Sequence, residues 1–291
     1  MNYFNKYLPA ALLIVCLLII RPAFCATWFA GIGNDGYIND VNGMFSALSN
    51  SPGMQDIAIN SIIFENQPGS GIENSIYNLG SSVHQEDLIF WYYSGHGSCT
   101  DDVNQDETAA GSTAFNDYDE TIGLLNHSDQ ITDDNLALAF NSLSLTGATI
   151  ITLFDTCYAG GFIGGNNDLN TVPGLTFFGS SMEYEESYSY TNEPYSIFTQ
   201  GLILGLEDFN ADLNKDGTII AQEWFDFSYN YTTGSVLNQH PVFSGNGDII
   251  ISSIHSVPIP GSGWLFLVSC LVLLQAKKKI KVKDIIIIFS K

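Results

Sequence analysis

The feature that most constrains the fold is a short apolar run, Ile150–Phe154, that stops abruptly at small and polar residues. A run of this length, rich in β-branched and aromatic residues, is typical of a strand buried on both faces of a sheet. It is followed by Asp155-Thr156-Cys157, which places a cysteine at the carboxyl end of a central strand, where open α/β sheets bind ligands. A single cysteine is more often structural than reactive, so other residues must decide its role.

A second apolar run, Asp87–Tyr93, is also followed by a reactive residue. It leads into Ser94-Gly95-His96-Gly97-Ser98. The carboxyl ends of parallel strands lie at one edge of a sheet, so adjacent strands would bring His96 near Cys157. A neighbouring histidine can deprotonate a thiol, and the amides of Gly97 and Cys157 would bind an oxyanion. The two strand ends together favour a cysteine nucleophile.

The rest of the chain predicts strands that alternate with helices. This alternation indicates an α/β fold with a mainly parallel sheet and helices on both faces. Between Cys99 and about Thr132 the sequence predicts one long acidic loop. The predicted strands are Thr27–Ile32, Ile57–Phe64, Asp87–Tyr93, Ala148–Phe154, Leu175–Ser180 and Asp248–Ser252, and the predicted helices are Asp40–Leu48, Ile72–Leu79, Asp133–Leu143 (capped by Thr132) and Tyr195–Leu206.

A twelve-residue segment, Asp212–Glu223, fits the EF-hand calcium loop at every key position. Gly217 makes the turn, and the expected ligands are the side chains of Asp212, Asn214, Asp216 and Glu223 and the carbonyl of Thr218. Oxygen ligands alone favour Ca²⁺ over Zn²⁺. The sequence therefore predicts a calcium site, without a second loop of this pattern to pair with it. A turn that binds no metal is the alternative.

The distribution of charge along the chain indicates which classes of binding partner are favoured. Of nine basic residues only Lys215 lies between residues 26 and 276, whereas of 31 acidic residues only Asp284 lies outside that range. A nucleic-acid partner is disfavoured because phosphate neutralisation needs Lys and Arg. The composition favours metal ions or cationic substrates, although a solvated acidic surface explains most of these charges.

Both ends of the chain resemble sorting signals. Residues 1–25 combine Lys6, the apolar core Ala10–Ile20 and small residues near Ala26, which predicts an export signal peptide. Residues 255–291 combine two prolines, the apolar run Trp264–Leu274 and a lysine cluster. This end resembles the PEP-CTERM tail that an exosortase recognises and removes, and a plain membrane anchor is the alternative. Either interpretation predicts export of residues 26–254 to the periplasm, the cell surface or the medium, with membrane association through the C-terminal segment.

The motifs Tyr93–Ser98 and Asp155–Gly161 resemble those of the caspase-like cysteine peptidases, in particular the bacterial metacaspase-like branch. The similarity extends over about residues 26–254 and includes Ser196–Thr199. It implies a caspase-like three-layer sandwich and a cysteine-type endopeptidase acting on peptide or protein substrates. The implied catalytic residues are Cys157 as nucleophile, His96 as general base and acid, and Gly97 in the oxyanion hole. The family also binds calcium at acidic residues, for which Asp133 and Asp134 are candidates.

By motif position, the specificity pocket of the family corresponds to Asp40, Ser94 and Asp155, which implies cleavage after Arg or Lys. Caspases proper use Arg to hold a substrate Asp, and this chain has no Arg after Arg21. Tyr37 stands where the family often has Cys and would narrow the pocket. Legumain-like cleavage after Asn is the alternative specificity. The alternative function is a catalytically silent, surface-anchored calcium-binding module.

Cys99 lies three residues after His96. Export would place the chain in an oxidising compartment, where disulfides form and persist. A reversible Cys99–Cys157 disulfide that blocks the nucleophile is therefore a further hypothesis.

Overall fold

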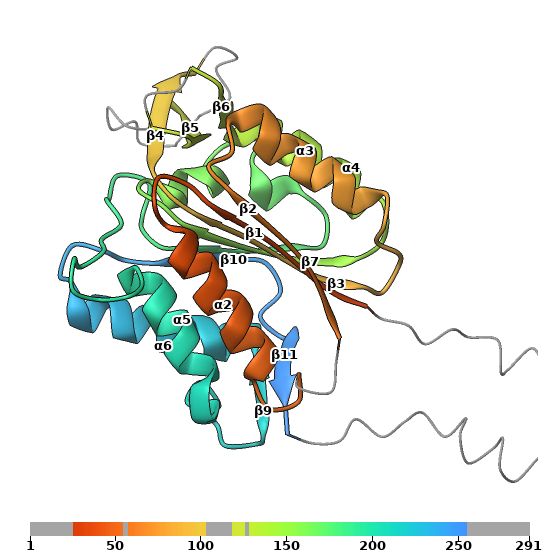
Figure 1. Cartoon of the computed structure of the whole chain (residues 1–291), viewed down its shortest axis with the longest axis vertical. Coiled ribbons are helices and arrows are strands. Elements are labelled where there is room, and N and C mark those ends of the chain that lie inside the picture. Colours follow the sequence, from red (N-terminus) through yellow and green to blue (C-terminus); the bar gives the residue numbers. More distant parts are fainter. Residues whose placement is uncertain (1–25, 55–57, 103–117, 126–127, 255–291) are drawn as a thin grey trace, which may run out of the picture. The chain divides into compact units, whose positions relative to one another are not determined.

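A computed structural model of the chain describes residues 26–54, 58–102, 118–125 and 128–254 (Figure 1). These residues belong to one unit that spans residues 24–255. In this part of the chain no helix is long and apolar enough to cross a membrane. The predicted export signal over residues 1–25 and the predicted sorting signal or anchor over residues 255–291 lie outside the described residues and stay predictions.

The described residues contain a six-stranded sheet, as the alternating pattern predicts. Five of its strands are parallel, and the edge strand β10 runs antiparallel to β8. In spatial order the strands are β10 (Val242–Ser244), β8 (Leu175–Gly179), β7 (Thr149–Asp155), β3 (Leu88–Ser94), β1 (Thr27–Gly33) and β2 (Ile59–Glu65).

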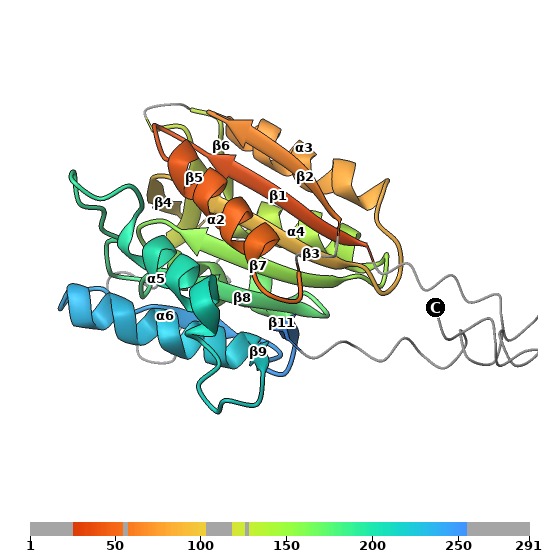
Figure 2. The same cartoon turned by 60° about the horizontal axis from the view of Figure 1, so that its bottom comes forward.

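Helices cover both faces of this sheet (Figures 1 and 2). One face packs against α3 (Gly69–Gly80) and α4 (Asp133–Ser144). The other face packs against α2 (Ile38–Asn50), α5 (Ile197–Leu206) and α6 (Ala221–Ser235). Three short 3₁₀ helices complete the helical elements of the described residues: η1 (Ala159–Ile163), η2 (Leu169–Thr171) and η3 (Glu207–Phe209). The predicted caspase-like three-layer α/β sandwich is confirmed.

Strand β7 shows why the apolar run forms a central strand. Ile150 and Phe154 point into the hydrophobic core beneath α3 and α4, whereas Ile151 and Leu153 point into the core beneath α2, α5 and α6. All four side chains are fully buried. Successive side chains of a strand face opposite sides of the sheet, so only a continuously apolar strand can serve two cores.

The predicted acidic loop from Cys99 to Thr132 is wrong in part. Its described residues belong to a three-stranded antiparallel sheet of β4 (Gly97–Asp101), β5 (Tyr118–Gly123) and β6 (Gln130–Thr132). Strand β5 buries the polar residues Asp119, Glu120 and Thr121. The sequence of β5 therefore lacks the alternation of apolar and polar residues by which a strand is predicted.

The C-terminal part of the fold also differs from the sequence prediction. The sequence does not predict helix α6, because its aromatic and β-branched residues favour strands. The helix is stabilised by tertiary packing, in which Trp224 is fully buried. The predicted strand Asp248–Ser252 corresponds to β11 (Ile250–Ser253), which pairs with β9 (Thr218–Ile220) outside the main sheet.

Truncation of Phe154 should destabilise the fold strongly. The Phe154 ring is fully buried, and its centroid lies 5.2 Å from that of Trp91 and 5.0 Å from that of Phe162. We expect Phe154→Ala to lower the free energy of unfolding by about 3–5 kcal/mol, as other buried Phe truncations do, in urea titrations. Leu145→Ala, at a side chain that is 88% exposed, should change it by less than about 0.5 kcal/mol. Equal effects of the two variants would contradict the assignment of Phe154 to the core.

Candidate active site

The register of two neighbouring strands brings the predicted catalytic residues to one edge of the sheet. Strands β3 and β7 pair in parallel, with Ser94 opposite Asp155. His96 and Cys157 each follow two residues beyond these partners. Both side chains line one small cavity of about 80 Å³. The structure therefore brings the two predicted catalytic residues together.

The walls of this cavity come from several elements. Asp155 and Ser196 contribute to it, together with Tyr37 before α2 and residues 187–189 of the segment between β8 and α5. The Tyr37 ring meets the His96 ring edge-on, with 5.8 Å between centroids. The predicted narrowing of the pocket by Tyr37 agrees with its place in the cavity wall, next to the imidazole.

The backbone around Cys157 leaves one amide available. The N–H of Thr156 donates to Ser180 Oγ (3.1 Å), and that of Tyr158 donates to the Glu185 carbonyl (2.8 Å). Within the described residues the Cys157 N–H has no such acceptor. An amide in this position is suited to bind an oxyanion, as the sequence predicts.

Gly97 packs directly on the Cys157 peptide. A Cβ atom at Gly97 would lie 2.2 Å from the Cys157 carbonyl oxygen and 2.5 Å from Thr156 Oγ1. Only glycine fits this approach of β4 to the nucleophile. The structure therefore places Gly97 beside Cys157. That the Gly97 amide donates to an oxyanion stays a prediction.

The Cys157 thiol contacts the backbone of Ser187. The Ser187 N–H donates to Cys157 Sγ (3.4 Å), and the thiol lies 3.8 Å from the Ser187 carbonyl oxygen. Burial raises the pKa of Cys157 above its ordinary value, and the negative charges of Glu186 and Asp155 raise it further. A raised pKa favours the protonated thiol, so Cys157 would need a base to act as the predicted nucleophile.

Asp40 is the first of two buried carboxylates beside the dyad. It is 2% exposed. Its Oδ2 accepts hydrogen bonds from the hydroxyls of Ser94 and Ser196 (both 2.6 Å), and its Oδ1 accepts the Ser196 N–H (3.0 Å). Burial raises its pKa, while these hydrogen bonds oppose the rise.

Asp155 is the second buried carboxylate. Its Oδ2 accepts the hydroxyl (2.6 Å) and the N–H (3.0 Å) of Thr199, and its Oδ1 accepts the Ser187 hydroxyl (2.7 Å). Burial, followed by the negative charge of Asp40, raises the pKa of Asp155 to about 6. Asp40, Ser94 and Asp155 thus form one group, as the family resemblance implies.

Three residues hold these carboxylates in place and have no predicted role in the sequence: Ser187, Ser196 and Thr199. Ser187 carries no pattern that marks it in the sequence. Ser196 and Thr199 belong to a quoted motif, and their spacing of three residues at the start of a predicted helix is a usable signal. The first amides of a helix lack intrahelical partners, and external acceptors such as these two carboxylates satisfy them.

Side-chain oxygens of the predicted calcium loop accept hydrogen bonds from backbone amides of the same loop. Asp212 accepts the N–H groups of Asp216 (3.1 Å) and Gly217 (2.9 Å), and Glu223 reaches back across the loop to the Asn214 N–H (3.1 Å). Lys215 and Gly217 have positive φ angles. The described residues hold no group of three or more His, Cys, Asp or Glu side chains already gathered as around a metal ion. The three carboxylates of the loop, Asp212, Asp216 and Glu223, are therefore not gathered in this way, and the calcium site stays a prediction.

The other two acidic candidates, Asp133 and Asp134, differ in burial. Asp133 is fully buried, whereas Asp134 is partly exposed in the first turn of α4, with its N–H bonded to Asp133 Oδ1 (2.8 Å). Burial, followed by the negative charge of Asp168, raises the pKa of Asp133 to about 8. Asp133 also accepts the Glu120 N–H (3.0 Å), so it ties α4 to β5.

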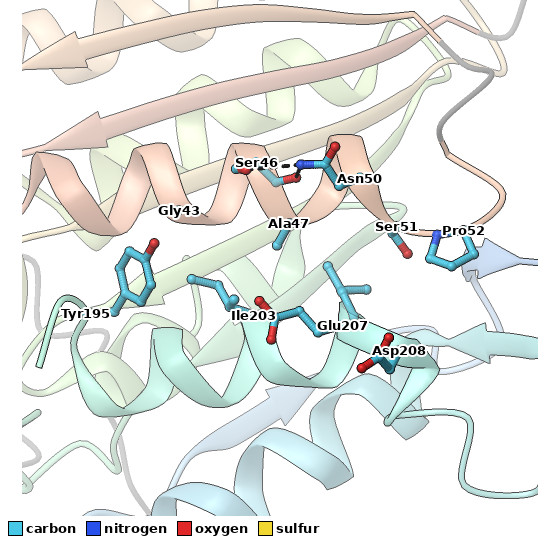
Figure 3. Close-up of a pocket in the computed structure, with 11 residues that line it drawn as sticks. Gly43, Ser46, Ala47, Asn50, Ser51, Pro52, Tyr195, Ile203, Glu207 and Asp208 are labelled. Atoms are coloured by element: carbon cyan, nitrogen blue, oxygen red, sulfur yellow. Dashed lines mark hydrogen bonds between the residues drawn. The ribbon is translucent and has the colours of Figure 1, made fainter.

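A larger cavity lies between α2 and α5 (Figure 3). Its volume is about 410 Å³, and Figure 3 shows Tyr195 at one end and Glu207 and Asp208 toward the other. Neither His96 nor Cys157 lines it. Size alone would favour this cavity as the ligand site, but the chemistry-bearing residues lie in the smaller one.

Cys99 and Cys157 are both free thiols in this structure, and Cys99 is exposed on β4. The hypothesis of a reversible disulfide between them stays a prediction.

A mainly parallel sheet between two helical layers is consistent with a caspase-like fold, and His96 and Cys157 lie just beyond the ends of two neighbouring strands. Comparison with known proteins agrees. Residues 26–165 match the family model of the metacaspase, peptidase C14 domain. Metacaspase-1 of Schizosaccharomyces pombe is 32% identical over 134 residues, which cover 43% of this chain and 30% of that relative. These two matches support a caspase-like cysteine peptidase.

A crystal structure of a Geobacter sulfurreducens protein shows a similar fold, with a TM-score of 0.54 and 13% sequence identity over 77% of this chain and 95% of the other. At this identity the likeness concerns the fold alone. The chain covers only 30% of the length of Metacaspase-1, and the calcium loop lies beyond the matched residues 26–165.

The exposed charge of Glu186 should slow the reaction of Cys157 with alkylating agents. Removal of a negative charge lowers the pKa of a nearby thiol and raises its thiolate fraction. We expect Glu186→Gln to react about twofold faster with iodoacetamide at pH 8, since exposed charges act weakly through water. The alkylation rate is followed by mass spectrometry. Glu193→Gln, in the same segment, should leave the rate unchanged, and a slower reaction of Glu186→Gln would refute this assignment.

Proposed function

We propose that this chain is an exported, calcium-binding cysteine endopeptidase that cleaves peptide bonds after Arg or Lys. The observation that carries the proposal is a pair of buried carboxylates at the cavity that holds His96 and Cys157. Asp155 lines this cavity, and Asp40 lies behind its wall, bonded to Ser196. Their hydrogen-bond donors are hydroxyls and amides, and the only Lys or Arg between residues 26 and 254 is Lys215, in the calcium loop. A cationic substrate side chain would supply the missing positive charge.

The chemistry follows from the placement of the two catalytic residues. His96 takes the proton of the Cys157 thiol, and the thiolate forms a bond to the carbonyl carbon of the scissile peptide. The Cys157 and Gly97 amides donate to the resulting oxyanion. His96 then gives its proton to the departing amine as the C–N bond breaks. Water, deprotonated by His96, hydrolyses the thioester and restores the thiol.

The electrostatics of the pocket favour Arg or Lys over the alternatives. A buried carboxylate without a cation is costly to ionise, which is why the pKa of Asp155 rises to about 6. A guanidinium or ammonium group recovers that cost, whereas a neutral Asn amide recovers little and an Asp side chain adds repulsion. Legumain-like cleavage after Asn is therefore the less favoured specificity.

Residues Asp212, Asn214, Asp216 and Glu223, with the Thr218 carbonyl, would hold Ca²⁺. The EF-hand spacing of these residues and the hydrogen bonds within the loop support this assignment. The ion supplies charge neutralisation for the carboxylates. The loop lies between η3 and α6, and its residues Thr218–Ile220 form β9, which pairs with β11. Ordering of the loop by an ion would therefore affect how α5 and α6 pack against each other.

The termini support the proposed location. The signal-like residues 1–25 and the tail over residues 255–291 would send residues 26–254 out of the cytoplasm. An exosortase-type enzyme would process the tail, or the tail would anchor the protein in a membrane. Mass spectrometry of the mature protein decides between these two fates.

The specificity is tested with irreversible peptidyl electrophiles. We expect a probe ending in Arg to label Cys157, and probes ending in Asn or Asp to fail. Asp155→Asn should lower kcat/KM for a peptidyl-Arg substrate by about 100-fold, because one partner of a buried charge pair is lost. Wild-type kcat/KM should also fall as the pH drops through about 6, since Asp155 takes up a proton there and loses its charge.

The control for this experiment is Asp248→Asn, which makes the same charge change at an exposed residue and should leave the kinetics intact. Equal labelling by all probes would reject the basic specificity. Absence of labelling by every probe, with an intact fold, would favour the silent calcium-binding module.

Calcium should raise the melting temperature. A ligand at 100 times its dissociation constant stabilises a fold by about 2.7 kcal/mol, or roughly 5–10 °C for a domain of this size. We expect EDTA to remove this shift in the wild type, and Glu223→Gln to abolish the response to calcium. Glu207→Gln, a nearby exposed carboxylate outside the loop, should respond like the wild type. An unchanged melting temperature on adding EDTA would count against the calcium site.

A further inference from the structure

Gln239 lies fully buried between α6 and β10, and its side-chain amide joins two segments of the active-site region, Ser180 and residues 187–188. Its Nε2 donates to the Ser180 carbonyl (3.0 Å) and to Ser187 Oγ (3.1 Å). Its Oε1 accepts the Tyr188 N–H (3.1 Å). A carbonyl can only accept and a backbone N–H can only donate, so these partners fix which end of the amide is which.

This amide sets the direction of a short chain of hydrogen bonds. Because Gln239 Nε2 can only donate, Ser187 Oγ accepts from it and keeps its own proton for another partner. The Ser187 hydroxyl gives that proton to Asp155 Oδ1 (2.7 Å). A hydroxyl that donates to a carboxylate stabilises the ionised form, and the Ser187 hydrogen bond does lower the pKa of Asp155 against the effect of burial.

The same segment also ties the nucleophile to this chain of hydrogen bonds. The Ser187 N–H donates to Cys157 Sγ (3.4 Å). His240 holds the segment from its other end, because its N–H and its Nδ1 both lie 2.7 Å from the Glu185 carboxylate. The Glu185 carbonyl in turn accepts the Tyr158 N–H beside the nucleophile. Residues 239 and 240 therefore fix the position of residues 185–188 against both Asp155 and Cys157.

We infer that Gln239 is a positioning residue of the specificity pocket: it orients Ser187 so that Asp155 is held ionised and ready to pair with a basic substrate side chain. It touches neither the substrate nor the reacting atoms. The inference rests on the basic specificity proposed above and deepens it, because the acceptor of the substrate cation depends on a residue from a distant part of the chain.

The variant that tests this role is Gln239→Glu, which keeps the size of the side chain and the acceptor for Tyr188. It replaces the amide donor with an acceptor, so the Ser187 hydroxyl turns toward the introduced carboxylate and away from Asp155. We measure the affinity of benzamidine, a cation that fits a pocket for Arg, by calorimetry between pH 5.5 and 8.5. In the wild type the affinity should fall below about pH 6, where Asp155 takes up a proton.

In Gln239→Glu this midpoint should move upward by about one pH unit, the typical effect of losing a hydrogen bond to a charged group. Ser187→Ala, which removes the hydroxyl itself, should show the same shift. Asn238→Asp adds an equal charge at the adjacent exposed residue and should keep the wild-type midpoint. A merely structural role would lower the affinity at all pH values without moving the midpoint. Wild-type midpoints in both Gln239→Glu and Ser187→Ala would overturn the inference and leave the basic specificity standing.

A second measurement needs no ligand. Gln239→Met keeps the volume but removes the acceptor of the Tyr188 N–H, so deuterium uptake in residues 185–190 should rise, while Asn238→Asp should exchange like the wild type. Unchanged uptake in Gln239→Met would overturn the positioning role. If the wild type binds no benzamidine at any pH, the proposed basic specificity fails, and this exchange experiment then decides the role of Gln239 by itself.

Discussion

The active site depends on one constraint, the parallel pairing of β3 and β7 with Ser94 opposite Asp155. The pairing is fixed by burial on both faces, because Trp91 and Phe154 fill one core while Tyr92 and Leu153 fill the other. A slip by one residue would exchange the two faces of a strand. Asp155 would then lose Thr199, and Ser94 would lose Asp40. The hydrophobic core thus sets the positions of the polar site at its edge.

Helix α5 connects this site to the predicted calcium loop. Its first turn donates to both carboxylates, through the Ser196 and Thr199 amides and hydroxyls. The positive end of a helix dipole favours negative charge there, by up to about 2 kcal/mol in partly buried sites. The other end of α5 runs through η3 into the loop Asp212–Glu223, and α6 packs alongside. The predicted calcium loop and the two carboxylates therefore lie at opposite ends of one helix.

The sequence predicts the layers of the fold and the residues at the strand ends because both have a local signature. Apolar runs mark the central strands, and glycines mark the turns beside His96 and Cys157. The sequence does not predict β5, whose buried residues Asp119 and Glu120 are polar, nor α6, whose helical state depends on packing. No sequence pattern predicts the roles of Ser187 and Gln239, and the reason is different. Their roles come from contacts across 32 and 59 residues of chain, with Asp155 and Ser180 respectively.

The acidic composition has a structural consequence at the pocket. A lysine or arginine of the chain beside Asp40 and Asp155 would neutralise both carboxylates and remove the need for an external cation. The structure instead surrounds them with neutral donors, Ser94, Ser187, Ser196 and Thr199, which orient the charges without cancelling them. Each such donor offsets only part of the desolvation penalty, as the pKa of about 6 for Asp155 shows. A bound basic side chain would relieve the remaining penalty, which is the physical basis of the proposed preference for cationic over neutral ligands.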